Sequence, residues 1–121
     1  MKTIILLDDD AELREYFSAH LQAHGFTVIA QANSQNITDL VKRNNAACII
    51  TDLIMPGHEG MEGIFLAKQI QGLKIIAMSS SSAFLRIADG LVDRCLHKPI
   101  SGPDLVAVVS AVLSENDTAT K

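Results

Sequence analysis

Three consecutive aspartates follow an apolar run near the start of the chain. The run Thr3–Leu7 is apolar and β-branched without a polar break, which is typical of a strand buried on both faces. Asp8, Asp9 and Asp10 then place like charges at its carboxyl end, where their repulsion is unfavourable unless a positive charge lies nearby. One interpretation is a solvated loop in which one Asp caps the next helix. The other is a cation site whose remaining parts come from elsewhere in the chain.

Strand and helix patterns alternate along the sequence, so these acids stand at one of several similar strand ends. Short apolar runs predict strands at 3–7, 27–30, 48–51, 74–78 and 93–97. Periodicity and capping residues predict a helix capped by Ser34 and further helices at 11–24, 61–71, 83–89 and from Ser101 to about Leu113. This alternation predicts one α/β domain over residues 1–121, with a doubly wound, mostly parallel sheet and a polar tail at about 115–121.

Polar side chains stand where the predicted strands end. In a doubly wound sheet, ligands bind outside the carboxyl ends of the strands. The first strand ends at Asp8 and Asp9, the third at Asp52, the fourth at Ser79 and the fifth at Lys98. Carboxylate oxygens suit Mg²⁺, which often bridges to a phosphate, and an ammonium and a hydroxyl suit the phosphate itself. The sequence therefore predicts a Mg²⁺ and phosphate site at this edge.

Composition narrows the class of protein. The formal net charge is −4 and no basic cluster occurs, so we expect no direct binding to nucleic acid. No apolar run approaches the length of a bilayer span, and the first residues lack the features of a secretory signal, so we expect no membrane partner. Cys48 and Cys95 lie in apolar stretches without metal-ligand spacing, and we expect both to be buried free thiols. These features predict a cytoplasmic protein.

Four segments carry a family resemblance: "LLDDD", "IITDLIMPGHEGMEG", "IIAMSSSS" and "CLHKPI". In this order, and over residues 1–114, they resemble the motifs of receiver domains of two-component response regulators. The resemblance implies a flavodoxin-like fold with strand order 2-1-3-4-5. It also implies that the partner donating the phosphoryl group is a histidine kinase or a histidine phosphotransfer protein.

The resemblance assigns roles to the acids. Asp52 would be the nucleophile that takes the phosphoryl group and becomes an acyl phosphate. Asp9 and Asp52 would ligate Mg²⁺ directly, together with the main-chain carbonyl of Ile54, and Asp8 would act through a bound water. The triple aspartate allows Asp9 and Asp10 to be the pair instead. We prefer Asp8 and Asp9, because they directly follow the strand and Asp10 is better placed as the helix cap.

The resemblance also assigns the remaining catalytic groups. Lys98 would pair with the phosphoryl oxygens, and Ser79 would hydrogen-bond one of them, although four consecutive serines leave Ser80 as the alternative. The Lys98–Pro99 peptide bond would be cis. Cys95 stands where the family usually has an aromatic, and the short stretch before Lys98 predicts a short fourth helix.

Two functions remain open. The leading hypothesis is a stand-alone receiver that is phosphorylated and signals to an unknown downstream protein by contact, with catalysis limited to gaining and losing its own phosphoryl group. The alternative is a non-switching adaptor or dimerisation module with the same fold, which Cys95 and the short fourth helix favour. A phosphohydrolase of the haloacid-dehalogenase type is set aside, because it needs a second Asp two residues after the nucleophile, where Ile54 stands.

The final predicted helix, "DLVAVVSAVLS", is apolar on more than one side. Leu105 and Val112 belong to one stripe, whereas Val106 and Leu113 lie off it. We therefore expect an exposed apolar patch on the surface formed by the fourth helix, the fifth strand around Cys95 and this last helix, which would mark a protein interface and a possible homodimer through the last helix face.

Overall fold

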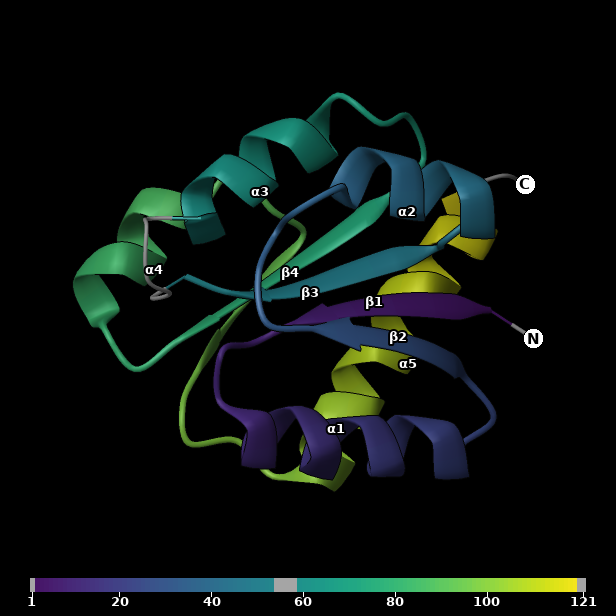
Figure 1. Cartoon of the computed structure of the whole chain (residues 1–121), viewed down its shortest axis with the longest axis horizontal. Coiled ribbons are helices and arrows are strands. Elements are labelled where there is room, and N and C mark those ends of the chain that lie inside the picture. The colour runs from purple at the N-terminus through teal and green to yellow at the C-terminus, as the bar shows by residue number, and fades with distance from the viewer. Residues whose placement is uncertain (1, 54–58, 120–121) are drawn as a thin grey trace.

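A five-stranded parallel sheet forms the centre of the described part of the chain (Figure 1). The computed structural model describes residues 2–53 and 59–119. The strands are β1 (Thr3–Leu7), β2 (Thr27–Gln31), β3 (Cys48–Asp52), β4 (Lys74–Ser79) and β5 (Arg94–His97). The helices are α1 (Ala11–Ala23), α2 (Ile37–Asn44), α3 (Glu59–Lys68), α4 (Ser82–Ala88) and α5 (Gly102–Ala119). The sheet order is β2-β1-β3-β4-β5, which confirms the predicted flavodoxin-like fold.

Helices cover both faces of the sheet and bury a separate core on each. Helices α1 and α5 lie on one face, and α2, α3 and α4 lie on the other (Figure 1). Alternate residues of β1 supply the two cores: Ile4 and Leu6 face α1 and α5, whereas Ile5 and Leu7 face α2 and α3. Every residue of β3 is buried, as expected for a central strand of a parallel sheet. The rigid centre of the sheet thus carries Asp52 at its end.

The connection between β1 and α1 confirms one sequence prediction. Asp10 is the N-cap of α1, and its carboxylate accepts hydrogen bonds from the backbone N–H groups of Glu12 (3.0 Å) and Leu13 (3.2 Å). This fixes the start of the helix directly after the acids. The helix ends before Gly25, whose φ of +101° suits a residue without a side chain.

The start of α2 differs from the prediction that Ser34 caps it. The N-cap is Asn36, in a left-handed conformation and with no side-chain capping bond. The side-chain amide of Gln31 donates to the carbonyl oxygens of Asn33 (2.7 Å) and Gln35 (2.9 Å). Because this amide holds the loop open over residues 33–35, the helix begins only at Ile37.

Two other helices have ends that differ from prediction. Helix α3 begins at Glu59 and ends at Lys68, short of the predicted residue 71. Helix α5 continues past Leu113 to Ala119, so most of the predicted polar tail is helical. No glycine or proline occurs after Pro103 before Ala119, so no residue breaks this helix. Helix α4 has seven residues, which confirms the expected short fourth helix.

The part of the predicted apolar patch that lies on α5 is wrong, whereas on α4 the side chains of Phe84 and Ile87 are exposed. Val106 and Leu113, the residues off the main stripe, are buried in the same core as Phe17 and Leu21 of α1. The second apolar side of α5 is therefore covered by α1 within the same chain, and it leaves no apolar surface for a homodimer at these two residues. Cys95 is also partly buried, against the core on the opposite face.

The contact between α1 and the start of α5 is tight. The N–H of Gly102 donates to the Tyr16 hydroxyl oxygen (2.8 Å), and the ring of Tyr16 packs edge-on against that of His20 at 4.7 Å between centroids. A Cβ atom on Gly102 would overlap the His20 ring. Glycine at position 102 therefore lets the two helices approach closely without displacing the His20 ring.

We expect Gly102→Ala to lower the free energy of unfolding by about 1–2 kcal/mol, as overpacking does in a close contact. In a His20→Ala background the same substitution should be close to neutral, because the ring that the new methyl group would overlap is absent. Urea unfolding of the parent, the two single variants and the double variant measures both effects. Equal losses in the two backgrounds would show that the ring is not the obstacle.

Candidate functional site

Asp8, at the end of β1, is fully buried and has a hydrogen-bond partner for each of its polar groups. Its side chain accepts from the Asp10 N–H (2.9 Å) and from the Lys98 ammonium (2.9 Å). Its backbone N–H donates to the Gln31 carbonyl (3.2 Å), and its carbonyl oxygen accepts from the Arg14 guanidinium (2.7 Å). A buried carboxylate is tolerated when it is paired in this way, so the position of Asp8 is fixed.

Asp52, at the end of β3, lies beside Asp8 because β1 and β3 are neighbouring strands. Its side chain is only 8% exposed, and one carboxylate oxygen lies 3.3 Å from the Lys98 nitrogen. Lys98, which directly follows the edge strand β5, therefore bridges the two buried acids. The backbone N–H of Lys98 donates to the backbone carbonyl of Ser79 (2.9 Å). The Lys98–Pro99 peptide bond is cis, as the family resemblance implied.

The ammonium of Lys98 is charged at neutral pH. Burial alone would lower its pKa, but the hydrogen bond and charge of Asp8 and the nearby charge of Asp52 outweigh it, so the pKa is raised above the ordinary 10.5. A raised pKa means that the folded protein holds this proton more tightly than the unfolded chain. The stabilisation is therefore complete at neutral pH and is lost only as the pH rises through the raised value.

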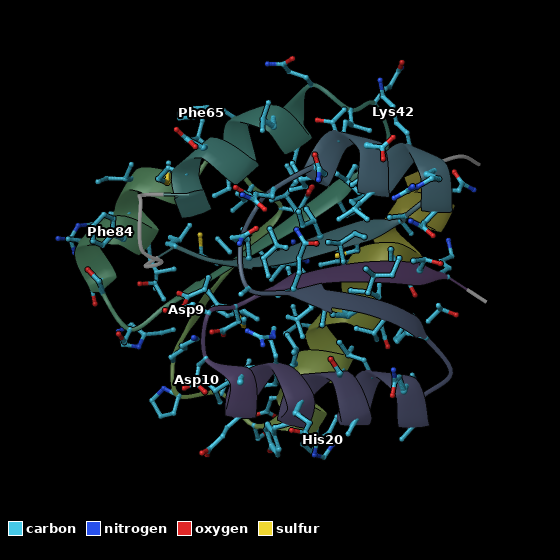
Figure 2. The ribbon with its side chains drawn as sticks, viewed as in Figure 1. Asp9, Asp10, His20, Lys42, Phe65 and Phe84 are labelled. Atoms are coloured by element: carbon cyan, nitrogen blue, oxygen red, sulfur yellow. The ribbon has the colours of Figure 1, made fainter. Side chains whose placement is uncertain are left out.

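Asp8, Asp9 and Asp52 form a group that could hold a metal ion. Each offers a carboxylate oxygen, and these atoms all lie within 4.8 Å of one another. Asp9 is exposed, while the other two are buried, so one side of the group opens to solvent. Figure 2 shows Asp9 at the end of β1 and Asp10 at the start of α1. All-oxygen ligands with access to water suit Mg²⁺. The carbonyl of Ile54, the fourth predicted ligand, lies outside the described residues.

Ser79 and Ser80 occupy different environments. Ser79 is the last residue of β4 and is fully buried, and its hydroxyl oxygen accepts the N–H of Ser81 (2.9 Å). Ser80 is exposed. In the sheet, Asp52 is level with Met78, so Ser79 is one residue beyond it on the neighbouring strand. The hydroxyl at the strand end is therefore that of Ser79.

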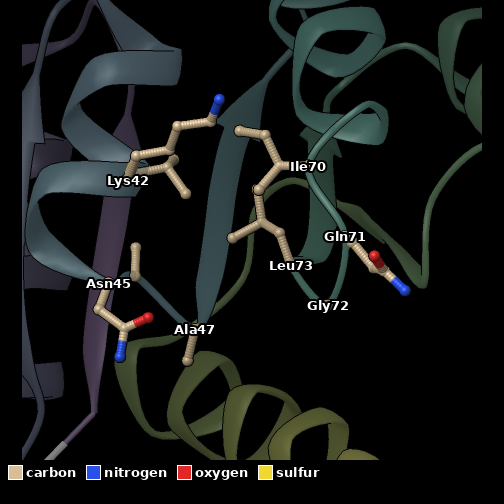
Figure 3. Close-up of a pocket in the computed structure, with 9 residues that line it drawn as sticks. Lys42, Asn45, Ala47, Ile70, Gln71, Gly72 and Leu73 are labelled. Carbon is tan, nitrogen blue, oxygen red and sulfur yellow. The ribbon is translucent and has the colours of Figure 1, made fainter.

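Two cavities help to delimit the site. One, of about 300 Å³, borders Lys98 and is lined mainly by apolar side chains of α1 and of the segment after β5, including Phe17 and Ile100. A larger one, of about 460 Å³, lies at the opposite edge of the sheet between α2 and the segment before β4 (Figure 3). Lys42 and Leu73 line it, and none of its lining residues carries a carboxylate. Of these two cavities, only the first borders the site, through Lys98.

Sequence reasoning missed Arg14. It lies on the first turns of α1 and reaches back to the Asp8 carbonyl. Its signal in the sequence was a basic residue four positions after the helix cap, on a helix that starts beside three acids.

The two cysteines are free, as predicted, but only Cys48 is fully buried. Burial raises the pKa of both thiols, with Asp89 adding to the effect at Cys95. Among the described helices, none is long and apolar enough to cross a membrane.

We expect Lys98→Met to lower the free energy of unfolding by about 3 kcal/mol at neutral pH, because it leaves two buried carboxylates without their cation. Added Mg²⁺ should raise the unfolding midpoint more in this variant than in the parent, since the site becomes more negative. Lys74→Met, which breaks a pair with Asp93 (3.7 Å) remote from the site, is the control and should respond to Mg²⁺ as the parent does. Equal Mg²⁺ responses in all three proteins would contradict the pairing.

Solved structures of receiver domains share this fold. The response regulator protein TrrA of Thermotoga maritima, whose crystal structure is a complex with Mg²⁺-BeF, superposes with a TM-score of 0.81 over 93% of this chain and 99% of its own, at 24% identity. A CheY-like receiver domain protein of Methanospirillum hungatei gives a TM-score of 0.88 at 21% identity, with 98% of both chains covered.

Relatives among the curated proteins include the transcriptional regulatory protein SrrA of Staphylococcus aureus. It is 25% identical over 120 residues, which make up 97% of this chain and 50% of SrrA. The chain thus spans about half the length of that relative. The family profile of the response regulator receiver domain matches residues 4–110. The chain therefore belongs to the response regulator receiver domain family.

Proposed function

We propose that this receiver domain accepts a phosphoryl group on Asp52 from a histidine kinase or histidine phosphotransfer protein, with Mg²⁺ as cofactor. The observation that carries the proposal is the Lys98 ammonium, which contacts both Asp52 (3.3 Å) and Asp8 (2.9 Å) beside the exposed Asp9. A nucleophilic carboxylate, a fixed cation and oxygen ligands for a metal thus meet at one point. Family membership supports this reading, because phosphoryl acceptance is the general function of receiver domains.

In the proposed reaction, a carboxylate oxygen of Asp52 attacks the phosphorus in line with the bond to the donor's imidazole nitrogen. The new bond is an acyl phosphate, and the electron pair of the broken P–N bond returns to the imidazole. Lys98 neutralises charge that develops on the phosphoryl oxygens, and the Ser79 hydroxyl donates to one of them. Ser79 can donate because its oxygen, not its hydrogen, is engaged with Ser81.

A metal would complete the charge balance of the site. Asp9 and Asp52 are the proposed direct ligands, with Asp8 acting through water and the Ile54 carbonyl as a further expected ligand. When bound, Mg²⁺ supplies a positive charge that brings the anionic phosphoryl group and the carboxylates together. Two observations support it: the close group of three acids, and the Mg²⁺-BeF complex of the structurally similar TrrA.

The output is proposed to be contact with a downstream protein. The exposed large apolar side chains include Phe65 and Leu66 of α3 and Phe84 and Ile87 of α4. Figure 2 shows Phe65 and Phe84 at the outer surface of their helices. Exposed apolar clusters are typical of interaction surfaces. Three further statements are predictions from the sequence: the receiver stands alone, it lies in the cytoplasm, and it does not bind nucleic acid.

The non-switching adaptor remains a second candidate, favoured by Cys95. Its thiol donates to the Leu85 carbonyl (3.7 Å) and packs in the core beneath α4, so no aromatic side chain is present there to change rotamer. An adaptor of this kind would keep the fold and the exposed apolar side chains but would not depend on phosphorylation. The next experiment separates the two candidates.

Asp52→Asn should abolish labelling by acetyl phosphate in the presence of Mg²⁺, because the amide keeps the shape of the side chain but is not a nucleophile. Intact-protein mass spectrometry measures the gain of one phosphoryl group. Asp39→Asn, which alters an exposed acid on α2, is the control and should label fully. Labelling of the Asp52 variant would move the acceptor to another acid, and an unlabelled parent would favour the adaptor.

Ser79→Ala should slow phosphorylation by about tenfold, since a charge-assisted hydrogen bond contributes about 1.5 kcal/mol. Ser80→Ala should leave the rate unchanged, because this neighbouring serine is exposed and is not at the strand end. Single-turnover labelling with acetyl phosphate compares the two. The reverse order of effects would assign the hydroxyl to Ser80.

A further inference from the structure

We propose that Arg14 is a positioning residue for the metal site, and that it acts by holding the peptide bond that carries Asp9. Its guanidinium donates to the Asp8 carbonyl oxygen at 2.7 Å, the shortest contact to Asp8 in the site. The inference rests on the proposed Mg²⁺-dependent function, because it assigns to Arg14 the orientation of one proposed ligand.

The argument begins with the other restraints on the acidic loop. The side chain of Asp8 is held by Lys98 and by the Asp10 N–H, and Asp10 is held as the cap of α1. Both ends of the segment Asp8–Asp10 are thus anchored without Arg14. Between these anchors lies the Asp8–Asp9 peptide bond, whose carbonyl oxygen contacts Arg14.

Planarity of the peptide bond carries this restraint to Asp9. The Cα of Asp8, its carbonyl group, the next N–H and the Cα of Asp9 lie in one plane. A hydrogen bond that fixes the carbonyl oxygen therefore restrains the orientation of this plane, and with it the position of the Asp9 Cα atom from which the carboxylate extends. Asp9 needs such help because it is exposed, whereas Asp8 and Asp52 are held by burial and by Lys98.

Charge and geometry predict opposite effects of losing Arg14. A guanidinium near three carboxylates opposes the approach of a divalent cation, so removal of the charge alone would strengthen Mg²⁺ binding. Loss of orientation at a ligand instead weakens metal binding, typically by 10-fold to 100-fold when a residue that supports a ligand is removed. The sign of the change therefore separates a positioning role from a purely electrostatic one.

The experiment is a Mg²⁺ titration of the full chain, followed by backbone amide NMR shifts. We expect Arg14→Met to weaken Mg²⁺ binding by about tenfold. Lys42→Met, which removes an exposed cation from the opposite edge of the sheet, is the matched control and should leave the dissociation constant within about twofold of the parent, since distant exposed charges are screened. Arg14→Lys, a second variant that keeps the charge, should show a smaller loss.

A double-mutant cycle tests whether Arg14 acts through Asp9. In an Asp9→Asn background, Arg14→Met should change Mg²⁺ affinity by less than about twofold, because the ligand that it orients is gone. Tighter or unchanged Mg²⁺ binding in Arg14→Met, or a tenfold effect that persists with Asn at position 9, overturns the proposal while Asp52 labelling stands. A parent that neither binds Mg²⁺ nor becomes labelled overturns the proposed function as well.

Discussion

The site depends on the contact of one ammonium with two buried carboxylates. Asp8 and Asp52 end adjacent strands, so the parallel sheet brings two like charges together in a region of low water access. Such an arrangement is unfavourable without a cation, and Lys98 supplies one from the end of β5, two strands away from β3. One ammonium does not neutralise three neighbouring acids, so the group keeps a negative charge. This residual negative charge favours the binding of a divalent cation. It also repels a phosphoryl anion, which would need such a cation in order to approach Asp52.

The sheet and most of the site could be predicted from sequence because their signals are local. Each strand is a short apolar run whose end is marked by a polar residue, and parallel pairing then forces those ends to one edge. The five predicted strands correspond to those observed with ends shifted by a single residue at most. Asp10 caps α1 and lies outside the group of Asp8, Asp9 and Asp52, and this could be anticipated from its place directly before the helix.

The features that escaped prediction depend on contacts between distant segments. The late start of α2 results from a Gln31 amide that belongs to another element, and local capping preference at Ser34 could not reveal it. The buried second side of α5 results from α1, which packs against it from the far end of the sequence. Arg14 is a similar case: a basic residue on a helix surface is usually solvated, and only the fold shows that it contacts a buried carbonyl. Propensity and periodicity describe a residue's own element, whereas these contacts arise from tertiary packing.

Cys95 raises the question of how the site communicates with the surface of α4. The structure contains a connection that needs no aromatic at position 95. The Ser79 hydroxyl accepts the N–H of Ser81, and the Ser81 hydroxyl in turn accepts the N–H of Phe84 and caps α4 (3.3 Å). The hydroxyl at the end of β4, the strand next to that of Asp52, is thus two hydrogen bonds away from the first turn of α4. Since α4 has only seven residues, the Ser81 cap is a large part of its stability, and this cap joins Ser79 to the helix that presents Phe84 and Ile87.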